Sequence, residues 1–206
     1  MASAVARGVV TFLTVATALA VGGAITAYMP DKDEQERPFV RTGAGSDSVD
    51  ARLFDAQVLG VRGGTKLAGG GAAHDTSGVW ILVTVRVTAK KETSSVGYAA
   101  LIDGDGRTFR ATERVTLPVG GRLLQPGLPV RMELAFEVPK DVPLPLAIRL
   151  AEPPFELRVQ AIAQIDLGLG APDLALYAGN TDVLRLKETA VDGLPSGAPS
   201  ASGGPA

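Results

Sequence analysis

The chain has 206 residues, of which 20 are basic and 22 acidic, with one histidine and no cysteine. This near balance of charge argues against a nucleic-acid partner, because nucleic-acid binders carry a basic excess. The lack of cysteine excludes disulfides, lipoprotein acylation, cysteine catalysis and cysteine-ligated zinc. A single histidine also excludes metal sites built from several histidines. We therefore expect no cofactor and no nucleic-acid partner.

An uncharged segment stands near the start of the chain. Residues 8–29 contain no charged side chain, and at about 1.5 Å per residue they could cross a bilayer core of about 30 Å. Arg7 precedes them, so the positive-inside rule predicts a cytoplasmic N-terminus. The alternative is a signal peptide cleaved after residues 18–20. We favour an uncleaved anchor because the apolar run continues to Met29. Both readings predict an extracytoplasmic C-terminal part.

The segments around the central region differ in composition from it. Residues 31–47 are charged at first and then rich in glycine and serine, which is typical of a flexible linker. Residues 195–206 contain only Pro, Ser, Gly and Ala and cannot bury enough apolar surface to fold. The predicted organisation is a cytoplasmic N-terminus (1–7), an anchor (8–29), a flexible linker (30–48), a β-domain (49–169), an irregular extension (170–194) and a disordered tail (195–206).

Alternation of apolar and polar residues predicts the two principal strands. In Val79–Ala89 the residues Ile81, Val83, Val85 and Val87 share one face. In Val130–Val138 every second residue is apolar, while charged residues and Ala135 occupy the positions between. Period-two alternation in β-branched residues is the signature of a half-buried strand. With hairpin signals between them, these strands predict an antiparallel all-β domain.

Shorter elements complete the predicted domain, with about eight strands at the spacing of a sandwich. We expect Gly60 to mark a bulge or bend in the first strand. Residues Gly63–Gly78 lack periodicity and are expected to form a long loop. The strands are expected at residues 50–61, 79–89, 98–102, 107–111, 113–117, 130–138, 146–150 and 155–165, with a Pro-Gly turn at 124–127.

Asp103-Gly104-Asp105-Gly106 has two readings. Asp-Gly pairs suit the positive φ angles of a type I′ hairpin turn. Asp-x-Asp-Gly also opens many calcium loops, but the residues from Arg107 onward do not continue the ligand pattern of an EF-hand. We favour the hairpin and assign no metal-binding residue.

Four segments follow one another in a characteristic order: Trp80–Val87, Tyr98–Arg110, Leu124–Gly127 and Phe136–Pro139. This succession resembles a family of immunoglobulin-like domains of unknown function, common in secreted and membrane-anchored bacterial proteins. Its members are similar to a mycobacterial secreted immunogenic protein. The resemblance implies an immunoglobulin-like antiparallel β-sandwich over roughly residues 50–167 and carries over no catalytic residue. The chain differs in lacking an acylation cysteine and in its long glycine loop.

His74 and Trp80 are the two residues for which we considered a role in catalysis or ligand binding. A Ser-His-Asp hydrolase would need His74 with Asp75 and Ser77, but close neighbours on one loop rarely converge in the required geometry. We expect His74 to be an exposed loop residue. Trp80, the single tryptophan, is expected to pack between the two sheets rather than to stack on a ligand. No catalytic residue is assigned.

The sequence thus predicts an immunoglobulin-like β-sandwich held by one N-terminal transmembrane helix. Its expected function is that of a binding or accessory module without catalytic activity, engaging an envelope or membrane protein. The alternative is a small-molecule or lipid carrier with its site between the sheets, which requires an apolar cavity there.

Overall fold

The computed structural model describes residues 14, 16–19, 21, 38–69, 72–113, 123–152 and 161–192. The chain divides into two units, Met1–Arg37 and Pro38–Ala206. The described residues of the first unit are helical. No helix formed by described residues has the length and apolar character to cross a membrane. Most of the anchor (8–29), residue 20 of the cleavage site (18–20) and the whole tail (195–206) lie outside the described residues, so these remain predictions.

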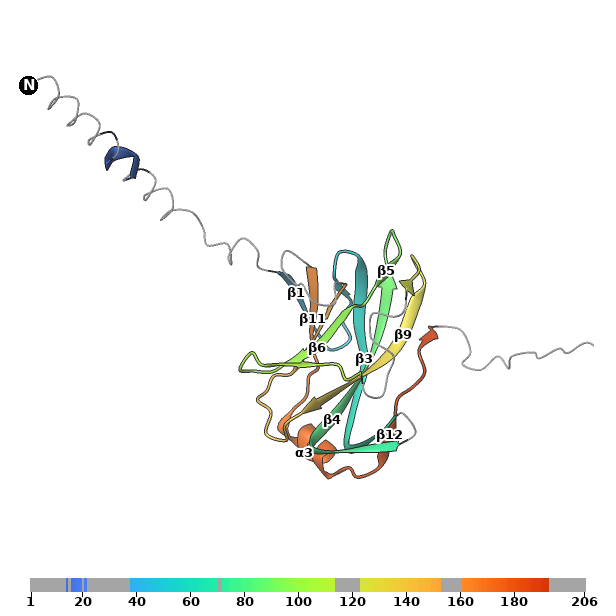
Figure 1. Ribbon diagram of the computed structural model, residues 1–206. Helices are drawn as coiled ribbons and strands as arrows, with labels where there is room; N and C mark the ends of the chain where they lie inside the picture. Colours follow the sequence, from blue (N-terminus) through green and yellow to red (C-terminus); the bar gives the residue numbers. More distant parts are fainter. Residues whose placement is uncertain are drawn as a thin grey trace, which may run out of the picture. The chain divides into compact units, whose positions relative to one another are not determined.

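The second unit is an all-β sandwich, which confirms the predicted class (Figure 1). One sheet, here sheet A, has five strands, and the other, sheet B, has six. Sheet A has the order β1 (Phe39–Ala44), β11 (Ala161–Asp166), β10 (Ala147–Ala151), β6 (Tyr98–Ile102) and β7 (Thr108–Arg110). Sheet B has the order β12 (Val183–Arg185), β3 (Phe54–Gly69), β4 (Ala72–Ala89), β9 (Pro129–Val138) and β13 (Ala190–Val191), with β2 (Val49–Asp50) beside β3. A separate pair joins β5 (Ser94–Ser95) to β8 (Leu123–Leu124).

The main core lies between the two sheets. The alternate residues Ile81, Val83, Val85 and Val87 of β4 are all fully buried there, as the sequence predicts. They pack in one cluster with inward residues of sheet A such as Ile148. The space between the sheets is thus occupied by side chains, and no observation favours the carrier hypothesis, which needs a cavity there.

Trp80 is buried as expected, but not between the sheets. It belongs to a second, smaller cluster with Leu67, Leu82, Ala135 and Leu184. In a strand, successive side chains point to opposite faces, so Trp80 and Leu82 occupy the outer face of sheet B. The indole Nε1 donates to the backbone oxygen of His74 at 3.1 Å. The expectation of a loop at Gly63–Gly78 hid this second cluster, because its partner Leu67 falls in that stretch.

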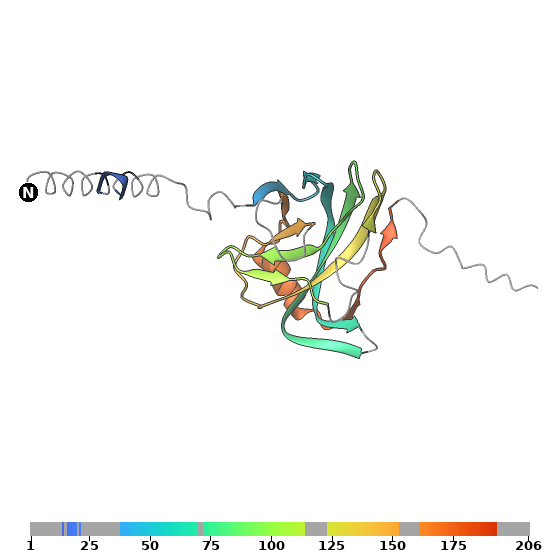
Figure 2. The same ribbon diagram turned by 45° about the horizontal axis from the view of Figure 1, so that its top comes forward.

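The predicted loop at Gly63–Gly78 is wrong, because its described residues, 63–69 and 72–78, belong to β3 and β4. The ladder continues to the pair Gly69 and Ala72, and Figure 2 shows both strands bending together towards that end. Two of the glycines, Gly63 and Gly78, are close-contact positions within the strands. A Cβ on Gly63 would lie 2.5 Å from Cγ of Tyr177, and one on Gly78 would lie 2.2 Å from the oxygen of Val138.

The residues predicted as an irregular extension, 170–194, contain regular elements. The helix α3 (Ala171–Gly179) begins after Gly170, whose backbone N–H donates to Asp173 Oδ2 at 2.8 Å. Leu174 of α3 is buried in the main core, and Tyr177 packs on Gly63. The helix therefore covers the end of the core beside β3 and β4. β12 and β13 follow it and extend sheet B at both edges.

Two further expectations near the N-terminal side need correction. Residues 39–44, expected in the flexible linker, form β1 because their backbone pairs in parallel with β11. The expected first strand (50–61) is interrupted after Asp50, since Arg52 adopts a positive φ of 67° and β3 begins only at Phe54. The bulge expected at Gly60 is confirmed by the register shift between Val58 and Gly60.

The turn at residues 103–106 joins β6 and β7 as predicted, but it is not type I′. Only Gly106, at the fourth position, has a positive φ, of 83°, and its N–H donates to the oxygen of Asp103 at 3.0 Å. A type I′ turn would need positive φ at the two central residues. A turn followed by a left-handed glycine is the usual three-residue hairpin connection instead.

The C-terminal segment 183–192, here called the strap, crosses the outer face of sheet B. It pairs with β3 at its start and with β9 at its end, while β4 lies between those two strands. Leu184 packs on the Trp80 cluster. At the other end, Asp192 accepts a hydrogen bond from Arg86 Nε and lies 4.0 Å from Arg131. Because Arg86 and Arg131 stand opposite each other in the ladder, Asp192 offsets the repulsion of two like charges.

A buried carboxylate fixes the middle of the strap. Glu133 of β9 is 4% exposed and accepts a two-pronged contact from Arg62, at 2.9 Å from Nε and 2.7 Å from a terminal nitrogen. It also accepts the backbone N–H of Lys187 at 2.8 Å and the hydroxyl of Thr84 at 3.2 Å. Burial opposes ionisation, but these donors outweigh it and hold the pKa of Glu133 below its ordinary value.

Glu133→Gln should loosen the strap. Removing the charge leaves Arg62 unpaired against the sheet, and since the Arg62 side chain is 35% exposed, the loss of unfolding free energy should be about 1–3 kcal/mol. Trypsin should then cut faster after Arg185 and Lys187, as measured by limited proteolysis with mass spectrometry. Glu137→Gln, on the same strand but exposed, is the control. Equal cleavage rates for both variants would contradict the role of Glu133.

The same carboxylate should make the strap sensitive to acid. Because the pKa of Glu133 is lowered on folding, its contribution is complete above the unfolded glutamate pKa of about 4.3 and is lost as pH falls through the lower folded pKa. Wild-type stability should therefore fall more steeply than that of Glu133→Gln as pH drops below about 4.5. Urea unfolding at a series of pH values measures both slopes, and parallel slopes would contradict this linkage.

Candidate functional site: a groove along the edge strand

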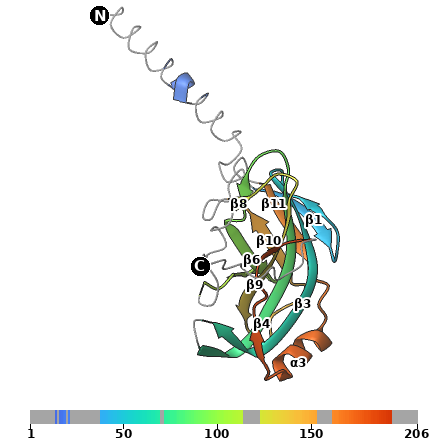
Figure 3. The same ribbon diagram turned by 90° about the vertical axis from the view of Figure 1, so that its right-hand side faces the viewer.

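β1 forms an open edge of sheet A. It lies outermost in the sheet and pairs only with β11 among the described strands, as Figure 3 shows. Every residue of the strand except the half-buried Gly43 is exposed. An edge strand of this kind presents unpaired N–H and C=O groups to solvent. β1 can therefore accept an additional strand.

A groove of about 620 Å³ accompanies the start of β1. Phe39, 66% exposed, and Arg41 stand in register with Ala161 and Ala163 of β11, and Ala163 faces the main core. Phe39 and Arg41 thus project from the inner side of the sheet, beyond its covered area. The groove is lined by Pro38, Phe39, Val40, Arg41, Asp50, Arg52 and Ala161.

Arg52 forms the opposite wall in an unusual backbone conformation. Its φ of 67° lies in the left-handed region, which disfavours residues other than glycine by roughly 1–2 kcal/mol. Two flanking hydrogen bonds, both of 2.8 Å, hold the turn: Ala51 N–H donates to the oxygen of Phe54, and Leu53 N–H donates to that of Ala51. The conformation places an exposed guanidinium group at the groove. Non-glycine residues in such regions cluster at functional sites.

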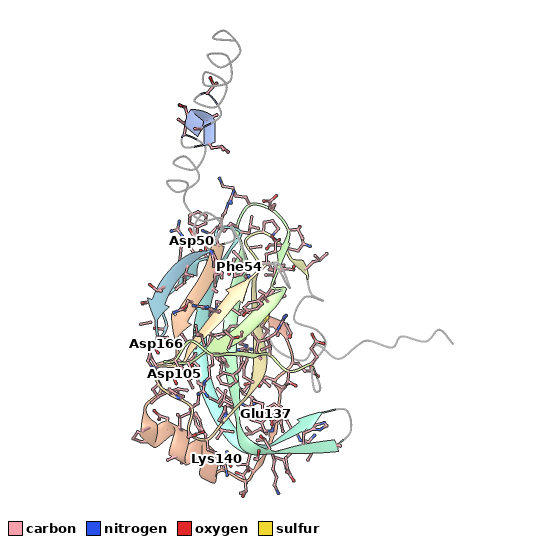
Figure 4. The ribbon with its side chains drawn as sticks, turned by 60° about the vertical axis from the view of Figure 1, so that its left-hand side comes forward. Asp50, Phe54, Asp105, Glu137, Lys140 and Asp166 are labelled. Atoms are coloured by element: carbon pink, nitrogen blue, oxygen red, sulfur yellow. The ribbon has the colours of Figure 1, made fainter. Side chains whose placement is uncertain are left out.

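Asp50 lies at the same end of the domain as the groove. Figure 4 labels it near the beginning of β1 and labels Asp166 near the end of β1. Lys90 Nζ lies 2.7 Å from Asp50 Oδ2 and 3.2 Å from Asp55 Oδ1. The hydrogen bond from Lys90, followed by that from the Arg52 N–H, lowers the pKa of Asp50. Asp50 also raises the pKa of Lys90. Lys90 is shared between Asp50 and Asp55. Together with Arg41 and Arg52 it gives three cations against two carboxylates, so this end of the groove has a net positive charge.

This arrangement suits an extended peptide. An added strand would pair with β1 through main-chain hydrogen bonds, and alternate side chains of that strand would enter the groove. Phe39 and Val40 offer apolar contact, while Arg41 and Arg52 favour an acidic side chain on the bound peptide.

The residues of the hydrolase alternative do not converge. His74 lies in β4 opposite Leu67, and its Nε2 is 3.2 Å from the oxygen of Gly69. Asp75 and Ser77 follow His74 in the same strand by one and three residues. Because side chains alternate along a strand, they point to the face opposite His74. The expected exposed loop histidine is thus a strand residue.

Asp103, the first residue of the alternative calcium loop, has its side chain fully buried. Its carboxylate accepts the N–H groups of Asp105 and Arg107 at 3.0 and 2.8 Å, and Arg107 Nε at 2.7 Å. Burial opposes ionisation, but the contacts from Arg107 outweigh it and lower the pKa of Asp103. The hairpin thus uses this carboxylate to close its own turn. The described residues contain no group of three or more potential ligand side chains that could hold a metal ion.

Comparison with known proteins gives two partial structural likenesses. No protein-family model and no curated protein matches the sequence. MPT63, a secreted protein from Mycobacterium tuberculosis, superposes with a TM-score of 0.47 and 14% identity over 63% of this chain and 98% of that protein. An uncharacterised β-sandwich protein from Clostridium difficile gives 0.43 and 9% over 68% and 99%. At these scores the fold of this chain rests on its own strand pairing.

Arg52→Gly should raise the free energy of unfolding, because it relieves the backbone strain at the groove. Glycine tolerates a positive φ, and after allowing for its greater freedom when unfolded, the variant should be more stable by about 0.5–1 kcal/mol. Urea unfolding measures this change. Arg52→Ala is the control. It removes the same guanidinium but keeps the strain, and a gain of stability in both variants would contradict the explanation.

Proposed function

We propose that this protein is an extracytoplasmic immunoglobulin-like binding module, without catalytic activity, that is tethered to the cell membrane by its N-terminal segment. Its partner is an envelope or membrane protein, which contributes an extended acidic segment that adds to β1. The observation that carries the proposal is the open edge of β1 beside a groove containing Phe39, Arg41 and Arg52.

The other support is independent of this groove. The uncharged run at residues 8–29 favours an anchor. Secretion after cleavage near residue 20 is the alternative location. It would leave the binding function of β1 unchanged.

Phe39→Glu should abolish capture of the partner. A carboxylate at this position repels an acidic segment and removes the apolar contact. The free energy of unfolding should change by no more than about 0.5 kcal/mol, because the side chain is exposed. The measurement is purification of tagged full-length protein from its native membranes in mild detergent, followed by mass spectrometry. The wild type should bring down one stoichiometric envelope or membrane protein.

Leu176→Glu is the matched control, because Leu176 on α3 is 69% exposed and lies outside the groove. It should retain the partner. Retention by Phe39→Glu as well would show that β1 is not the contact. Recovery of the protein from the medium with a new N-terminus near Val21 would overturn the anchor but leave the test of β1 intact.

A further inference from the structure

A second groove lies on the outer face of sheet B, between β3 and the strap. Its volume is about 280 Å³. The β-bulge at Leu59 shapes one wall, since the register with β4 shifts between Val58 and Gly60. A Cβ on Gly60 would meet no atom within 4 Å, so the missing side chain contributes open space. The lining residues are Leu59, Gly60, Val61, Arg62, Thr84, Arg131 and Lys187.

The charged side chains lining this groove are all cationic. Glu133 lies beside it, but its carboxylate is buried and already accepts four hydrogen bonds, from Arg62, Thr84 and the Lys187 backbone. Arg62 is therefore paired with Glu133, whereas Arg131 and Lys187 have weaker partners or none among the described residues. Arg131 approaches Asp192 only to 4.0 Å, and the ammonium group of Lys187 forms no ion pair with any described residue.

The walls of the groove are chemically divided. Leu59 is 38% exposed and forms the apolar part of the wall on the β3 side, whereas Arg131 and Lys187 come from β9 and the strap. Val61 stands opposite Val83 in the ladder and packs against the main core. A ligand filling this space would meet an apolar wall on one side and two cations on the other. The volume is near the lower limit of about 300 Å³ for ligand pockets, which favours a small molecule.

We propose that this groove binds a small organic carboxylate whose short apolar chain lies on Leu59. Its carboxylate accepts charge-assisted hydrogen bonds from Lys187 and Arg131. The site lies on sheet B and shares no lining residue with the β1 groove on sheet A, so either site can fail without affecting the other.

Ligand-observed NMR titration of the full-length protein in mild detergent tests the proposal at constant ionic strength. Sodium butyrate should bind saturably, while the neutral isostere butyramide should not. Lys187→Met removes the cation and should raise the dissociation constant for butyrate at least about 10-fold. Gly60→Val fills the groove and should do the same, because β3 has room for the new Cβ. Lys91→Met, an exposed lysine outside the groove, should leave binding unchanged.

Three results would overturn the proposal: no saturable binding of butyrate to the wild type, equal binding of butyramide, or unchanged binding in Lys187→Met. Inorganic phosphate should bind more weakly than butyrate because it makes no contact with the apolar wall. Binding of phosphate as tight as that of butyrate would overturn the assignment to carboxylates. Thermal unfolding of Gly60→Val checks its fold, and Lys187→Met, at an exposed position, keeps the test decisive if that variant is unstable.

Discussion

Sheet B must be covered on both faces because β4 is buried on both from Val79 to Val85. The inner face is covered by sheet A, which supplies the main core. Among the described residues no second sheet lies on the outer face, and the strap covers it through Leu184 and the Glu133 carboxylate. A polar group so deeply buried is tolerated only when its hydrogen bonds are complete, and Arg62, Thr84 and Lys187 complete them.

Both ends of the domain are therefore structural. β1 widens sheet A before the first strand of sheet B begins, and the strap completes sheet B after α3. A groove lies beside each terminal segment. One lies at Phe39, where β1 extends past the packed area of the sheets, and the other lies at Gly60, which the strap leaves exposed beside Lys187. The candidate sites follow from incomplete covering rather than from loops added to a finished sandwich.

Alternation in the sequence predicted the inner half of this structure well. The inward residues of β4 and β9, the β6–β7 hairpin and the bulge at Gly60 all follow from side-chain period and turn chemistry. The sites were beyond such reasoning for physical reasons. β1 is short and pairs with a strand more than a hundred residues away, and nothing in the sequence marks Arg52 as left-handed. The ion pair of Arg62 and Glu133 joins positions 71 residues apart, so its partners become neighbours only in the sheet.

The glycines of residues 63–78 show how one residue type supports opposite readings. In the sequence, Gly63, Gly64 and Gly78 lower strand propensity and suggest a loop. In the folded chain a Cβ on Gly63 would lie 2.5 Å from Tyr177 and one on Gly78 would lie 2.2 Å from the backbone oxygen of Val138, too close for a side chain. A Cβ on Gly64 would lie 3.1 Å from Leu184, a tight contact. The hairpin depends on these glycines because α3 and the strap pack against it, and those packing elements lie at the other end of the sequence. A local signal for disorder therefore becomes a requirement for tight packing once the C-terminal elements are in place.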